Sequence, residues 1–160
     1  MNKKVEKALN AQINAEIWSA YLYLSMSTHF ASEGFNGFSG WMKKQYGEEM
    51  EHAFRFMDYI VDRGGKVALA PVAEVPVKFG SPLEIFEQTL EHEKVVTDNI
   101  HKLVDLARSE EDKATESMLK WYVDEQVEEE ATASGIVDKL KLIDKNISGL
   151  FYMDSQLGVR

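Results

Sequence analysis

The 160-residue sequence contains no cysteine. Disulfide frameworks, zinc fingers, thiolate clusters and thiol catalysis are therefore excluded. No stretch approaches the roughly 18 consecutive apolar residues of a membrane span, and the first residues lack the apolar segment of a signal peptide, so we expect a cytoplasmic protein without a membrane partner. Basic residues are also few: 18 against 27 acidic ones, a net charge of -9. This balance argues against a nucleic-acid partner and favours attraction of cations.

Proline is scarce as well. It occurs only at positions 71, 76 and 82, so residues 1–70 and 83–160 are free of the strongest helix breaker. Asn36 is a candidate N-cap, and Ser81 followed by proline and an acid three positions later is a typical helix start. The length suits a single domain, 1–160. Apolar periodicity predicts helices over about 3–33, 36–64, 81–109, 113–144 and 146–157.

The connection over residues 65–80 is long and not helix-friendly. Fully extended it spans on the order of 50 Å, whereas a helix of about 28 residues is roughly 42 Å long. The connection can therefore run the whole length of a bundle, which makes the second and third helices parallel. We predict an all-α fold: a four-helix bundle with one long crossover plus a short C-terminal fifth helix.

Each of the four long helices has an apolar seam, read in steps of three and four residues, that becomes polar near its midpoint. In a bundle of helices of near-equal length these midpoints fall at similar heights. The polar positions are Glu16 in the first helix, Glu49 and His52 in the second, Glu93 in the third, and Gln126 and Glu129 in the fourth.

Four buried carboxylates at one level repel each other, and each costs several kcal/mol to desolvate. No lysine or arginine lies on the four seams to neutralise them. Two remedies remain: the carboxyl groups are protonated, or they bind cations. A single glutamate of this kind is usually a misassigned face, but four at matched heights favour a metal site. Carboxylates with one imidazole and no thiolate suit iron or manganese, and Glu49 and His52, three residues apart, share a helix face.

Three more glutamates, Glu48, Glu125 and Glu128, flank the seams. They fit either a solvated surface or a further, more hydrated ion site beside the first. Tyr23 lies two turns after Glu16 on the same seam. Its phenol could hydrogen-bond a ligand carboxylate, supply an electron to an oxidised intermediate, or simply be an ordinary core tyrosine with a satisfied hydroxyl.

Taken with these residues, the whole chain resembles a prokaryotic non-haem ferritin. The resemblance rests on Ala15-Glu16 with Tyr23, on Glu48-Glu49-Met50-Glu51-His52-Ala53, on Glu91-His92-Glu93, and on Glu125-Gln126-Val127-Glu128-Glu129-Glu130. It implies a first iron site of Glu16, Glu49 and His52, and a second of Glu49, Glu93 and Glu129 bridged by Glu49. It also implies a third site of Glu48, Glu125, Glu128 and Glu129, and makes Gln126 the glutamine of the ferroxidase centre.

Members of this family oxidise Fe(II) with dioxygen or hydrogen peroxide and store the ferric mineral in a hollow shell of 24 subunits. The resemblance therefore implies a ferroxidase and iron-storage protein. The fourth helix carries Gln126-x-x-Glu129 instead of a second Glu-x-x-His. This departure makes a bacterioferritin less suitable, and no haem is expected, although Met50 and Met57 leave it formally open. Two other classes stay open: a di-iron oxygenase acting on an organic substrate, and a metal-free helical bundle used for assembly.

Residues 17–24 are apolar nearly all round the helix, more than a bundle helix needs. We expect Trp18, Tyr21 and Leu22 to contact another subunit, the alternative being a bulkier core within the chain or cover from the crossover. The fifth predicted helix is too short to stand alone, so it should dock on its own bundle or pack with copies of itself about a symmetry axis.

Overall fold

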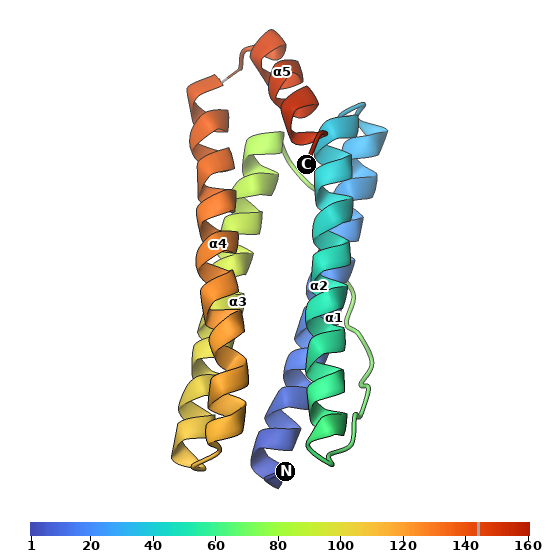
Figure 1. Ribbon diagram of the computed structural model, residues 1–160. Coiled ribbons are helices and arrows are strands. Elements are labelled where there is room, and N and C mark those ends of the chain that lie inside the picture. Colours follow the sequence, from blue (N-terminus) through green and yellow to red (C-terminus); the bar gives the residue numbers. More distant parts are fainter. Residues whose placement is uncertain (144) are drawn as a thin grey trace.

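The computed structural model describes residues 1–143 and 145–160. Within these residues the chain forms five helices: α1 (Lys3–Ser32), α2 (Asn36–Asp62), α3 (Pro82–Ser109), α4 (Lys113–Ile143) and α5 (Ile147–Leu157). Figure 1 shows the four long helices side by side, with α5 folded over one end of the bundle. The predicted fold class, a four-helix bundle with one long crossover and a short fifth helix, is confirmed. Residue 144, predicted as the end of the fourth helix, lies outside the described residues.

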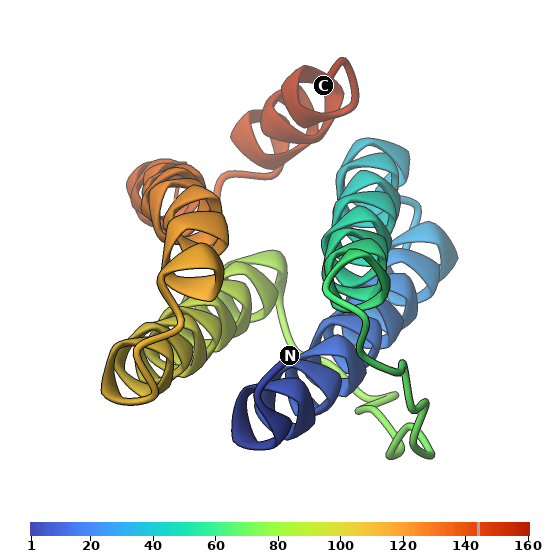
Figure 2. The same ribbon diagram turned by 60° about the horizontal axis from the view of Figure 1, so that its bottom comes forward.

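The four helices form two antiparallel pairs, α1 with α2 and α3 with α4 (Figures 1 and 2). The crossover returns along α1 to the end where α2 begins, so α2 and α3 run parallel, as the length of the connection predicts. No strand of the described residues lies beside this extended segment, and side chains of α1 hydrogen-bond to its backbone instead. Asn10 Oδ1 accepts from the Ala68 N–H at 2.7 Å, Trp18 Nε1 donates to the Glu74 carbonyl at 3.2 Å, and Ser25 Oγ to that of Pro76 at 2.6 Å.

The start of α2 is capped from a distance. Asn36 as N-cap is wrong: Phe35 holds that position and has no capping side chain. Instead, Asp154 Oδ1 of α5 accepts a hydrogen bond from the Phe38 N–H at 2.7 Å. At the other end, α2 stops at Asp62 rather than at the predicted 64, because Arg63 is the C-cap and Gly64 adopts a positive φ of 68°.

The core divides into two apolar clusters, one toward each end of the bundle. The cluster near α5 is rich in aromatic rings and includes Phe30, Phe38, Trp41 and Phe86. The cluster at the other end is largely aliphatic and includes Leu9, Ile60, Ile100 and Leu119. The polar residues of the four seams lie between the two clusters.

The apolar stretch of α1 is only partly available to a neighbour. Leu22 is buried in the core of its own chain, so its expected contact with another subunit is wrong. Trp18 is half-buried and hydrogen-bonded to the crossover, whereas Tyr21 is 54% exposed. None of the helices in the described part of the chain is both long and apolar enough to cross a membrane.

Candidate metal centre

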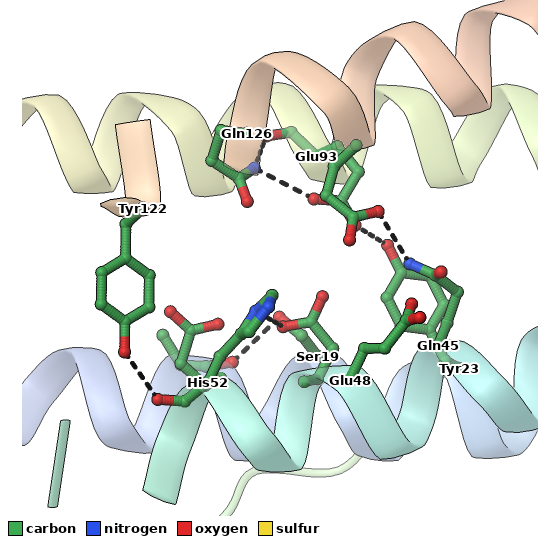
Figure 3. A network of polar contacts seen from close by, with 12 residues as sticks. Ser19, Tyr23, Gln45, Glu48, His52, Glu93, Tyr122 and Gln126 are labelled. Atoms are coloured by element: carbon green, nitrogen blue, oxygen red, sulfur yellow. Dashed lines mark hydrogen bonds and ion pairs between the residues drawn. The ribbon is translucent and has the colours of Figure 1, made fainter. Parts of the chain in front are cut away.

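The polar residues of the four seams meet between the two helix pairs. Each is buried, and Figure 3 shows side chains from all four long helices pointing into this one region. They lie together because helical periodicity puts each on the inner face of its helix, and because each lies near the middle of its helix. The set comprises Glu16 from α1, Glu49 and His52 from α2, Glu93 from α3, and Gln126 and Glu129 from α4.

Glu16, Glu49 and His52 form the tightest group. One ligand atom from each lies within 4.8 Å of the others, and His52 Nδ1 is 3.5 Å from Glu49 Oε2. Gln12 Nε2 donates to Glu16 Oε1 at 2.8 Å. Oε2 of Glu16 and Oε2 of Glu49 are buried, and neither has a hydrogen-bond partner within residues 1–143 and 145–160. Such orphaned acceptors are costly, and two carboxylate oxygens beside an imidazole are a donor set that suits ferrous iron.

Glu93 is held by hydrogen bonds. The Tyr23 hydroxyl donates to Glu93 Oε1, and Gln126 Nε2 donates to Glu93 Oε2 at 3.1 Å. Of the roles considered for Tyr23, the structure therefore shows the hydrogen bond to a predicted ligand. Among the described residues, Glu93 falls in neither of the two groups whose ligand atoms converge within 4.8 Å.

His52, Glu125 and Glu129 form the second convergent group. Gln45 Nε2 donates to Glu129 Oε2 at 3.0 Å and so fixes that carboxylate. Of the glutamates predicted for the third site, Glu125 and Glu129 are thus brought together with His52. Glu48 is half-buried and paired with an arginine, and Glu128 is exposed.

Burial governs the electrostatics of the centre. It raises the pKa of Glu16 and of Glu49 well above the usual range, with repulsion from neighbouring carboxylates adding to the effect. Burial also raises the pKa of Glu93, and it raises the pKa of Glu129 to about 7. Protonation and cation binding, the two remedies considered from the sequence, both relieve this cost.

Several contacts of the centre were not predicted from the sequence. Gln12 precedes Glu16 by four residues on the same helix face, so this spacing alone predicts a contact between the two side chains. The other contacts join distant segments and leave no local trace. The Tyr122 hydroxyl donates to the His52 carbonyl at 2.8 Å, and the Trp121 ring lies edge-on to the His52 ring, with centroids 5.5 Å apart. These two aromatic side chains fix the position of α2 at the histidine.

Known proteins match this chain in both sequence and fold. A family model described as a ferritin-like domain matches residues 6–143. The chain belongs to the ferritin family. This ferritin is 52% identical over 160 residues to the bacterial non-heme ferritin of Bacteroides fragilis, covering 100% of this chain and 99% of that protein. It is 39% identical over 157 residues to the bacterial non-heme ferritin of Campylobacter jejuni, covering 98% and 94%.

Solved structures give the same result. The fold of this ferritin matches a crystal structure described as a novel open pore ferritin from the hyperthermophilic archaeon Archaeoglobus fulgidus. The TM-score is 0.99 and the sequence identity is 51%, with 100% of this chain and 99% of that chain covered. The resemblance to a prokaryotic non-haem ferritin is thus confirmed over the whole chain.

Proposed function

We propose that this ferritin stores iron and is a ferroxidase, oxidising Fe(II) at a dinuclear centre inside its own bundle with dioxygen or hydrogen peroxide. The observation that carries the proposal is the buried group of Glu16, Glu49 and His52. Two carboxylate oxygens of this group have no hydrogen-bond partner in the described part of the chain. In this proposal Glu16, Glu49 and His52 hold one ferrous ion. Glu49, Glu93 and Glu129 hold the other, with Glu49 bridging.

Two substrate Fe(II) ions held together give one electron each to a single oxygen molecule. Carboxylate oxygens stabilise the harder, more highly charged Fe(III) and so favour the oxidation. Hydrogen bonds from neighbouring side chains orient these ligands. Gln45 donates to Glu129, and Tyr23 and Gln126 donate to Glu93. The proposal includes no haem.

The third site is proposed beside this centre, from Glu48, Glu125, Glu128 and Glu129. The convergence of Glu125 with Glu129 supports it. Glu129 belongs to both the second and the third site in this proposal. The two sites are therefore adjacent, and an ion leaving the dinuclear centre has only a short distance to move to the third site.

We also propose that the product is stored as mineral in a shell of 24 copies. The close similarity to a ferritin described as open-pored and the exposed apolar side chains of α5, Phe151 and Tyr152, support assembly. Light scattering after size-exclusion chromatography measures the assembled mass, and a monomer would overturn the shell. The cytoplasmic location predicted from the sequence stays a prediction.

The ferroxidase proposal is tested by adding Fe(II) aerobically and following ferric absorbance near the ultraviolet edge. We expect Glu49→Gln to slow the initial oxidation at least about tenfold, because loss of a bridging carboxylate removes a ligand from both ions. Glu51→Gln is the matched control: it changes an exposed glutamate two residues away on α2. Equal rates in wild type and in Glu49→Gln would overturn the site assignment.

The same assay separates storage from oxygenase chemistry. A storage protein oxidises many Fe(II) ions per chain when more are supplied, and the iron stays with the protein through a desalting column. An oxygenase would stop at the few ions of its centre. Retention of only about two ions per chain would therefore contradict iron storage.

A further inference from the structure

One glutamate predicted for the third site already has a cationic partner. Glu48 Oε2 lies 2.5 Å from Nη2 of Arg160, the last residue of the sequence. The same guanidinium lies over the Trp41 ring, 4.7 Å from its centroid. Only 26% of the Arg160 side chain and 31% of the Glu48 side chain are exposed. The arginine thus has both an ionic and an aromatic contact that hold it beside the centre.

The docking of α5 places Arg160 there. Asp154 caps the start of α2, and the Phe151 ring stacks on Phe35 with centroids 5.5 Å apart. Gly37 is required at this contact, since a Cβ there would overlap the Asp154 carbonyl. After α5 the chain turns back toward α2, where Figure 1 shows its C-terminal end.

Glu48 is electrostatically part of the centre. Figure 3 shows it alongside Gln45, the residue that fixes Glu129. Glu48 directly precedes Glu49 on α2, so its carboxylate charge lies beside the centre. A positive charge fixed on Glu48 therefore acts on any cation that approaches this side of the centre.

We propose that Arg160 is a built-in competitor for the third ion. A guanidinium keeps its charge at every physiological pH. While it is paired with Glu48, it occupies one ligand and repels an incoming divalent cation, so the third site fills only when that cation displaces Arg160. The ligands of the first ion, Glu16, Glu49 and His52, make no ion pair with Arg160 in the described structure. The inference rests on the proposed function and adds regulation to it.

The test measures binding and needs no catalysis. The metal-free, full-length assembled protein is titrated anaerobically with Zn(II), a redox-inert divalent probe, by isothermal titration calorimetry. We expect Arg160→Gln to tighten the weakest binding event about fivefold relative to the two tighter ones, the size of effect given by a partly exposed ion pair. Arg108→Gln, which removes an arginine paired with the half-buried Glu116 in the first turn of α4, away from the centre, is the matched control. Its affinities should equal those of the wild type.

Two further variants tie the effect to the ion pair. Adding Glu48→Gln to Arg160→Gln should abolish the gain, because the freed ligand is then missing. Arg160→Lys, which keeps the charge, should bind the third ion as weakly as the wild type. Equal third-site affinities in wild type, Arg160→Gln and Arg108→Gln would overturn the inference.

This failure differs from a failure of the proposed function. If Glu49→Gln leaves all Zn(II) binding unchanged, the dinuclear centre itself is wrong. If Glu49→Gln weakens the tight events while Arg160→Gln changes nothing, the centre stands and only the role of Arg160 is wrong. Thermal unfolding monitored by circular dichroism shows whether each variant remains folded.

Discussion

The ends of the bundle and its middle are buried to the same degree, yet their chemistry is opposite. At the end near α5, Phe86 packs on Phe30, Phe38 and Trp41 with ring centroids 5.3–5.9 Å apart. In the middle, Glu16, Glu49 and Glu93 are each 1% exposed. Burial of apolar rings stabilises the fold, whereas burial of carboxylates costs free energy. The apolar ends therefore stabilise the bundle against the unfavourable burial of its middle, where we propose that the ions bind.

The largest effect is expected from a substitution in the aromatic cluster near α5. Phe86→Ala should lower the free energy of unfolding by about 3–5 kcal/mol, because a fully buried ring leaves a cavity. Urea denaturation of the metal-free protein measures this loss. Phe54→Ala, at a phenylalanine that is 51% exposed, is the control and should cost less than about 1 kcal/mol. Equal losses in the two variants would contradict the role given to the aromatic end.

A somewhat smaller effect concerns the middle and depends on pH. Glu129 has its pKa raised from 4.5 to about 7 in the folded chain, first by desolvation. Below the unfolded pKa both states are protonated and the group contributes nothing. As the pH rises from about 4.5 to 7, the unfolded chain loses the proton first, so the free energy of unfolding falls, by up to about 3 kcal/mol.

Glu129→Gln should remove this part of the pH dependence and make the metal-free protein more stable at neutral pH. The measurement is urea denaturation at a series of pH values. Glu128→Gln changes the neighbouring, exposed glutamate and should keep the wild-type slope. Parallel curves for wild type and Glu129→Gln would contradict the unfavourable burial of this carboxylate.

The smallest effect concerns the contact between α5 and the start of α2, at the aromatic end of the bundle. Asp154→Ala removes the acceptor for the Phe38 N–H and should cost about 1 kcal/mol of unfolding free energy. Asp154→Asn keeps an oxygen acceptor and should cost less. If the alanine and asparagine variants are equally stable, the hydrogen bond across α5 and α2 is not what stabilises this contact.

Much of this architecture could be predicted from the sequence because it depends on local spacing. Proline placement and apolar periodicity gave the helix ranges, and Ser81 with Glu84 gave the start of α3. The prediction of Asn36 as N-cap was wrong, because Asn36 lies one position inside α2 and the distant Asp154 accepts a hydrogen bond from the first turn of that helix. A hydrogen bond from Tyr23 to a ligand carboxylate was one of the roles expected from the sequence. That the acceptor is Glu93, and that Gln126 donates to the same carboxylate, could not be predicted, since these contacts join three different helices.

By itself, the sequence determined that four helices are long, that each bears a polar group at the middle of its inner face, and that only a crossover of this length lets α2 and α3 run parallel. These follow from periodicity and chain length. The individual contacts between helices came from the tertiary structure: Tyr23 and Gln126 both donate to Glu93, Asp154 caps α2, and Arg160 pairs with Glu48. A side-chain contact depends on how two helices are rotated and offset against each other, and packing of the whole core sets those quantities.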